Sequence, residues 1–197
     1  LDNLSDMNVL EVYHRGKKII KDEKVEIRPC DPQLKNTVHL LGFRESDLCL
    51  PWREGKVHIL KMLEGQIVTE DVQEEVGYTE EKGRKVFKPD GTYQKIAAVE
   101  RHKNTGKIGV GIVKGFGLRG GAIASSVSHD SHNLIVIGDN DHDMYLAVQE
   151  LLRTQGGYTL VENGQVFDTL PLPIMGLMSD AGYEKVNEKL ARMIPKA

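Results

Sequence analysis

The sequence predicts an α+β fold, in which a mostly antiparallel or mixed β-sheet carries two helices. Many short apolar runs alternate with polar turns, and helical spacing occurs in only two segments near the C-terminus. With 197 residues and 40% hydrophobic content, the chain can form one main core and a small second unit. Two prolines interrupt the pattern at 28–32, so we expect domains at 1–29 and 30–197.

The first domain is expected to contain three strands with hairpin-like spacing, at 9–13, 17–20 and 24–27. Three strands alone make a weak domain, so another part of the protein is expected to complete their sheet. The second domain is predicted to begin with a hairpin of strands 57–63 and 66–69. The charged span 73–91 is predicted to be an exposed loop or frayed strand ends.

The remaining elements are predicted around a turn rich in Ser and His. A helix is expected through 145–152, with Asp139 or Asp141 as its N-cap and Gly156-Gly157 at its end. Asn163-Gly164 predicts a hairpin turn, because this pair favours the tight turn that joins two strands. Strands are expected at 94–100, 107–113, 122–125, 134–137, 158–161 and 165–167, and a second helix at 180–194.

Composition excludes several classes of partner. The formal net charge of −3 provides no basic field for nucleic acid, and no apolar stretch approaches the roughly 20 residues of a membrane span. Cys30 and Cys49 have no Cys-x-x-Cys spacing, and the start shows no signal-peptide pattern, which favours a cytoplasmic setting. The chain begins at Leu1 rather than Met, so we expect it to be a piece of a longer protein.

The segment Ser128-His-Asp-Ser-His-Asn133, here the Ser-His turn, concentrates the chemically useful side chains. Its hydroxyls, carboxylate, amide and two imidazoles can act as acid, base or ligand. The alternative is a turn that only satisfies its own backbone through side-chain hydrogen bonds. A Ser-His-Asp triad within 128–130 is not expected, because neighbours in sequence rarely face one another.

Two other patterns are candidate binding sites. Metal ligands could come from two clusters, although their spacing fits no closed-site template and helix capping explains the second cluster better. The glycine-rich segment 115–121 lacks the Gly-Lys-Ser/Thr ending of a phosphate loop, so Arg119 is expected to pair with a carboxylate or to be exposed. The two clusters comprise His129, Asp130, His132, and then Asp139, Asp141, His142 and Asp143.

Segments 114–133, 136–140 and 170–180 closely resemble the C-terminal portion of bacterial and archaeal adenine deaminases, as do 36–39 and 65–69. Segment 9–27 looks like the β-sandwich strands that follow the barrel in the amidohydrolase superfamily. The resemblance implies conversion of adenine and water to hypoxanthine and ammonia by a metal-bound hydroxide in a (β/α)8 barrel preceding this region. The superfamily's His-x-His motif is absent from this sequence, so manganese, iron or zinc is expected in the barrel and no cofactor in this chain.

We expect the Ser-His turn to reach the mouth of this barrel and to contact the purine or order a catalytic group. We expect auxiliary catalytic roles for His129, Asp130 and His132, and substrate binding by Ser128, Ser131, Asn133 and Arg119. The expected partners are adenine, the barrel and a second copy of the chain, in purine salvage or adenine catabolism. Two alternatives remain: a structural or dimerisation module without active-site contact, and an independent metal hydrolase built from both His/Asp clusters.

Overall fold

The computed structural model describes residues 1–19 and 29–197, which form two compact units, Leu1–Cys30 and Asp31–Ala197. In the first unit, strands β1 (Val12–His14) and β2 (Lys17–Ile19) form an antiparallel hairpin. Its turn residues Arg15 and Gly16 have φ values of 52° and 76°, as a tight hairpin turn requires. The first predicted strand is therefore present at 12–14 rather than 9–13, and the second is present over the described part of 17–20. The third, at 24–27, lies outside the described residues.

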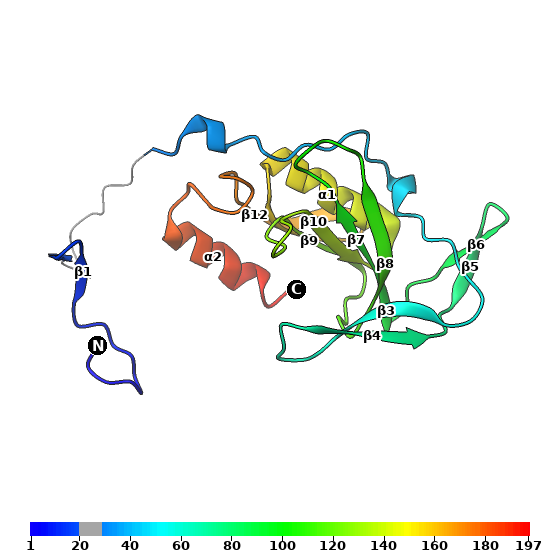
Figure 1. Cartoon of the computed structure of the whole chain (residues 1–197), viewed down its shortest axis with the longest axis horizontal. Helices are drawn as coiled ribbons and strands as arrows, with labels where there is room; N and C mark the ends of the chain where they lie inside the picture. The colour runs from blue at the N-terminus through cyan, green and yellow to red at the C-terminus, as the bar shows by residue number, and fades with distance from the viewer. Residues whose placement is uncertain (20–28) are drawn as a thin grey trace. The chain divides into compact units, whose positions relative to one another are not determined.

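The second unit is organised around an eight-stranded sheet with the order β12-β11-β9-β10-β7-β8-β3-β4 (Figure 1). Each neighbouring pair is antiparallel except β3 and β8, which are parallel, so the predicted mixed sheet and α+β class are confirmed. The strands are β3 (Val57–Met62), β4 (Thr69–Glu74), β7 (Tyr93–Val99), β8 (Ile108–Lys114), β9 (Gly121–Ser125), β10 (Leu134–Gly138), β11 (Gly157–Glu162) and β12 (Gln165–Pro171).

Of the two structures expected over 73–91, the exposed loop is wrong, because β4 extends to Glu74 and a second hairpin follows it. This hairpin pairs β5 (Tyr78–Glu81) with β6 (Arg84–Phe87). Its turn has positive φ at Lys82 and Gly83, and β6 ends in two buried residues, Val86 and Phe87. Only the end of the hairpin is apolar, so the charges of its exposed remainder concealed the strand pattern.

The first hairpin of this unit is present, but its second strand begins at Thr69 rather than at 66. Residues 63–68 form the turn, in which the Gln66 N–H donates to the Leu63 carbonyl at 3.1 Å. The hairpin expected at Asn163-Gly164 is confirmed, and both turn residues have positive φ. The turn at 63–68 is thus longer than expected, and it includes Gly65, whose φ is 68°.

Helix α1 (Asp141–Thr154) begins four residues before the expected segment, and its N-cap is neither of the predicted aspartates. Asn140 caps the helix, since its side chain accepts a hydrogen bond from the Asp143 N–H at 2.8 Å. Gln155 then ends the helix in the left-handed conformation before the predicted pair of glycines. The remaining helical segments are η1 (Pro32–Leu34), η2 (Glu45–Leu48) and α2 (Tyr183–Met193).

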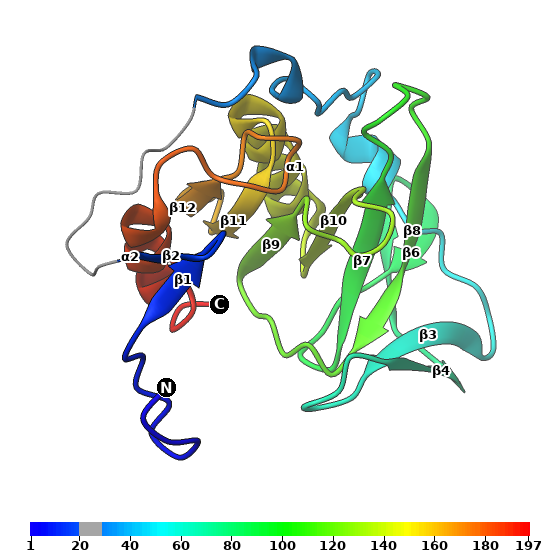
Figure 2. The same cartoon turned by 60° about the vertical axis from the view of Figure 1, so that its left-hand side comes forward.

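The main core lies between α1 and the middle of the sheet. Figures 1 and 2 show α1 along β9, β10 and β11, while β3 and β4 form the far end of the sheet. Met144, Ala147, Val148 and Leu151 of α1 are completely buried there. None of the described helices is long and apolar enough to cross a membrane.

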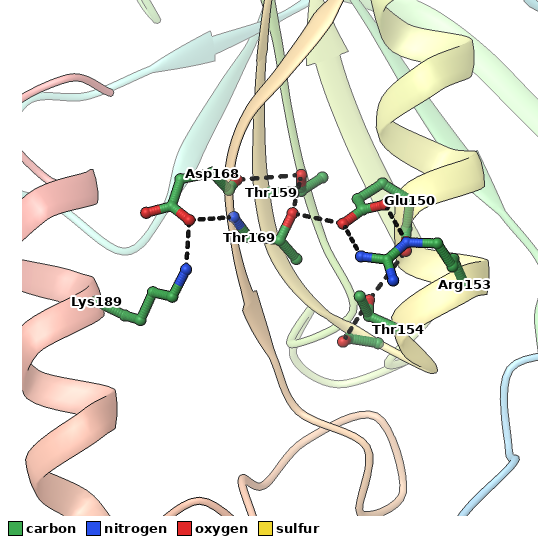
Figure 3. Close-up of polar contacts among 8 residues, drawn as sticks. Glu150, Arg153, Thr154, Thr159, Asp168, Thr169 and Lys189 are labelled. Atoms are coloured by element: carbon green, nitrogen blue, oxygen red, sulfur yellow. Dashed lines mark hydrogen bonds and ion pairs between the residues drawn. The ribbon is translucent and has the colours of Figure 1, made fainter.

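Helix α2 lies on the opposite face, over β12, where a smaller core contains Leu160, Leu170 and Met193. Asp168 on β12 points toward α2 and accepts a hydrogen bond from Lys189 at 2.5 Å (Figure 3). It accepts a second hydrogen bond from Arg192, also at 2.5 Å. The next residue, Thr169, points toward α1, because successive side chains of a strand alternate between faces. A polar network therefore joins both helices through one strand.

Candidate functional site

The Ser-His turn connects β9 to β10 at one end of the sheet, and antiparallel pairing fixes its base. Ile135 pairs with Ser125, the last residue of β9. The next residue, Ser126, is fully buried, and its hydroxyl donates to the Gly176 carbonyl at 2.5 Å while accepting from the Gly157 N–H at 2.7 Å. The turn therefore begins from a rigid stem.

Arg101, which follows β7, holds the other side of the turn. Its side chain is buried, with 2% of the residue exposed, and Nε donates to the His132 carbonyl at 2.5 Å. The two terminal nitrogens donate to the carbonyls of Thr37 at 3.2 Å and Met175 at 3.0 Å. In the part of the chain that is described, no carboxylate pairs with this guanidinium, and burial lowers its pKa from the usual value.

His129 and Asp130 project from the turn, with side chains 85% and 86% exposed. Nδ1 of His129 contacts the Asp130 carboxylate, so these neighbours face each other after all. The hydroxyl of Ser128 makes no hydrogen bond to any described residue, and a triad is not formed. The rings of His129 and His132 meet edge to face, with centroids 5.9 Å apart. The three residues expected to act in catalysis therefore lie together.

His132 and Asn133 close the turn and leave two polar atoms without partners. The His132 N–H donates to the Ser128 carbonyl at 2.6 Å, and Nε2 of His102 lies 2.9 Å from the Ser131 carbonyl oxygen. However, Nδ1 of His132 and Oδ1 of Asn133 are buried and have no hydrogen-bond partner among the described residues. Such an atom costs about 1–3 kcal/mol. The turn satisfies part of its backbone, but not these two side chains.

The second His/Asp cluster lies at the other end of β10, and its side chains already have partners. Asp139 accepts from the N–H groups of Gly120 and Gly121 at 2.5 and 3.1 Å, which fixes the entrance to β9. Asp143 accepts from the Gly164 N–H at 2.8 Å, and Nδ1 of His142 lies 3.0 Å from Glu45. Helix capping and loop attachment therefore account for this cluster.

Lys95 and Asp141 form a largely buried ion pair beside the same cluster. Burial raises the pKa of Asp141, and the bond from Lys95 opposes this effect without overcoming it. The pair borders a cleft of about 430 Å³ between α1, η2 and the β5–β6 hairpin. The most buried charges of the cleft thus neutralise each other.

The structure does not combine the two His/Asp clusters into one metal site. A five-residue strand such as β10 separates its ends by about 17 Å. Over residues 1–19 and 29–197, no three His, Cys, Asp or Glu side chains are grouped to hold a metal ion. The interpretation as an independent metal hydrolase using both clusters is therefore wrong.

Arg119 is also separated from the Ser-His turn. It precedes β9, whereas the turn follows this strand, and its guanidinium lies beside Gly91 at the end of the sheet that carries Lys95. The structure brings together Ser128, Ser131 and Asn133 with the three auxiliary residues, and it leaves Arg119 out of this group. Arg119 is exposed, which is one of the two arrangements expected for it.

Sequence reasoning missed Arg101, which lies just after the strand expected at 94–100. The alternation of β7 carried the signal, since Lys95, Ala97 and Val99 are buried on the face toward α1 and Arg101 continues this series. Its partners are backbone carbonyls from distant segments, which no sequence pattern identifies.

Comparison with known proteins gives consistent matches. The family model "Adenine deaminase C-terminal domain" matches residues 66–197. A protein named adenine deaminase from Desulfitobacterium hafniense (strain Y51) is 47% identical over 194 residues, covering 98% of this chain and 33% of the relative. Adenine deaminases of Nitratidesulfovibrio vulgaris (strain DP4) and Petrotoga mobilis are 40% and 39% identical over 98% of the chain and 34% of their own length. The chain spans about a third of the curated relatives it matches.

Proposed function

This chain belongs to the adenine deaminase C-terminal domain family, and from that premise we propose that it is the C-terminal portion of an adenine deaminase. The complete protein hydrolyses adenine to hypoxanthine and ammonia, and this chain alone is inactive. The observation that carries the proposal is similarity to adenine deaminases over 98% of the chain at up to 47% identity. A cytoplasmic role in purine salvage or adenine catabolism accompanies it, as the low cysteine content suggests.

The proposal assigns a divalent metal, manganese, iron or zinc, to a catalytic barrel supplied by the remaining part of the protein. The described residues of this chain do not fit such an ion, because their His and carboxylate side chains do not converge in a group of three. The contribution of this chain therefore lies in positioning, hydrogen bonding and proton handling.

The Ser-His turn is proposed to contact the active site of that barrel. Deamination requires a proton for the departing amino group, and an exposed imidazole can hold one at neutral pH. His129, paired with Asp130, is the side chain available for this task. Asn133 and the two serines supply donors and acceptors that match a purine edge, on which N7 accepts and the amino group donates. The unpartnered atoms of His132 and Asn133 support this role.

One observation favours the alternative, a structural or dimerisation module. Strand β12 is an edge of the large sheet, and it exposes Val166 and Phe167, each more than 40% accessible. An open edge with apolar side chains can pair with a second copy of the chain. Under this alternative the Ser-His turn makes no contact with substrate.

Turnover of adenine to hypoxanthine distinguishes these proposals. This chain is assayed alone with manganese, iron or zinc, and again after the catalytic part of the protein is added. Activity only after recombination is expected, and activity of the chain alone would contradict the proposal. In the complete enzyme, His129→Ala is expected to lower kcat about 100-fold, the lower range for general acid–base residues. Unchanged turnover in the His129, Asp130 and His132 alanine variants would favour the structural module.

A further inference from the structure

We propose that Arg101 is the positioning residue of the Ser-His turn and sets the geometry in which this turn meets the substrate. The inference rests on the function proposed above, but the attachment of the turn to Arg101 can be tested without it. Arg101 itself is buried and does not touch the substrate.

The guanidinium joins three segments that are distant in sequence. Its acceptors are the carbonyls of Thr37, His132 and Met175, which lie 64, 31 and 74 residues away from it. Because the guanidinium is a rigid planar fork, bonds from its separate nitrogens fix the three carbonyls relative to one another. A Lys ammonium at the same position cannot reproduce this planar arrangement.

The chain beside Met175 is shaped to receive this group. Gly176 has a φ of 71°, and a Cβ atom at this position would lie 2.8 Å from one terminal nitrogen of Arg101. The same glycine offers its carbonyl to the buried Ser126 hydroxyl that anchors β9. Both stems of the turn are thus attached to one small region, 175–176.

Packing alone does not explain a cation here. A buried charge is unfavourable unless it is paired, and an apolar side chain of similar volume fills space at lower cost. The bond to the His132 carbonyl has a specific consequence, because His132 has a φ of 51°, a conformation uncommon for residues other than glycine. Arg101 holds the peptide that orients His132, next to the two unpartnered atoms and within ring contact of His129.

The test compares Arg101→Met and Arg101→Lys with two controls. Arg153→Met removes an arginine that pairs with Glu150 on α1, and Leu151→Ala lowers stability through the core without touching the turn. Amide NMR signals of the 197-residue chain are recorded for 128–133 and for the central strands. In Arg101→Met the turn signals are expected to shift or broaden while β9 and β10 keep theirs, and Arg101→Lys is expected to be intermediate. If Arg101→Met does not fold, Arg101→Lys carries the same comparison.

Turnover of the complete enzyme supplies the second measurement. Misplacing catalytic groups by about 1 Å can cost about 100-fold, so kcat of Arg101→Met is expected to fall by about this factor, with partial recovery in Arg101→Lys. Leu151→Ala is expected to retain kcat within about twofold at a temperature where it is folded.

The outcomes separate the two hypotheses. Unchanged NMR signals of the turn in the Arg101 variants would overturn the positioning role. Altered turn signals with a kcat loss no greater than that of Leu151→Ala would overturn its catalytic consequence. If, in addition, the His129, Asp130 and His132 variants keep full turnover, the function proposed for the turn fails while the structural attachment by Arg101 stands.

Discussion

Asp168 provides the sharpest test of how α2 is held on the sheet, and Asp168→Asn is the informative change. The substitution keeps the shape of the side chain and its acceptor for the Thr169 N–H (Figure 3), but removes the charge that Lys189 and Arg192 contact. The Asp168 side chain is only 4% exposed, whereas those of Lys189 and Arg192 are 37% and 62% exposed. The two cations can therefore return to water, while the carboxylate cannot.

The magnitude follows from these contacts. Hydrogen bonds that involve a charged group contribute about 1.5–3 kcal/mol each, and rehydration of the two cations recovers part of the loss. We expect Asp168→Asn to lower the free energy of unfolding by about 2–3 kcal/mol. For a unit of this size, that corresponds to a fall in Tm of roughly 4–12 °C. The assay is urea and thermal unfolding of the whole chain, followed by circular dichroism.

The control is Glu162→Gln, which removes a half-exposed ion pair with Lys196 just beyond the same helix. Such a pair contributes about 0–1 kcal/mol. Burial by itself raises the pKa of Asp168, but the bonds from Lys189, Arg192 and Thr169 outweigh it, and the net pKa is lowered. The stability that Asp168 contributes is therefore fully present above the pKa of an aspartate in the unfolded chain. It is lost as pH falls through the pKa of Asp168 in the folded chain. Equal stability of the two variants at pH 7 would refute this reasoning.

Three further predictions concern the sheet, a loop and the far end of β9. Gly121→Ala places a Cβ 2.1 Å from a carbonyl oxygen of β11 and is expected to lower the free energy of unfolding in urea by about 3 kcal/mol. Gly109→Ala, which has open space around the new Cβ, should change this free energy by no more than about 1 kcal/mol. Glu100 accepts N–H bonds from the following loop, led by that of Thr105, and these bonds hold its pKa at about 2. Glu100→Gln should therefore destabilise the chain at pH 7. The difference in unfolding free energy between this variant and the parent should vanish as pH falls from about 4 toward 2. Arg119→Ala in the complete enzyme is expected to leave KM for adenine unchanged, and a large rise would place the opposite end of the sheet at the active site.

The elements predicted best from sequence were those with a local signal strong enough to specify them. Asn163-Gly164 fixed its hairpin because both residues adopt positive φ readily. The apolar run of β10 and the periodic segment of α1 were identified because each buries a continuous face. By contrast, the β5–β6 hairpin was missed, since its pairing depends on Trp52, whose indole donates to the Val76 carbonyl at 2.8 Å and whose ring packs on Tyr78. That contact joins residues about 25 positions apart, so no periodic pattern in the local sequence indicates it.

The candidate site illustrates the same limit. The composition of the Ser-His turn predicts a candidate site in this segment, because hydroxyls, a carboxylate and two imidazoles are concentrated there, and its role stays a prediction. The strand expected at 122–125 already lies between Arg119 and this turn, but sequence spacing could not reveal that Arg101 reaches the turn from the end of β7. That contact depends on which strand ends meet, and strand order in the sheet is not contained in local spacing.

The two ends of the central strands differ in how they use polar side chains, and this difference favours one end for binding. Near the start of α1, the carboxylates of Asp139, Asp141 and Asp143 are occupied by backbone N–H groups or by Lys95. At the Ser-His turn, the buried guanidinium of Arg101 holds the backbone, and two side-chain atoms have no partner among the described residues. Unpaired buried polar atoms are unfavourable unless another molecule or domain supplies the missing hydrogen bonds. Gln94, at the start of β7, carries one such atom at the opposite end, against two at the Ser-His turn. We therefore expect a contact with another part of the protein to gain more at the Ser-His turn than at the opposite end.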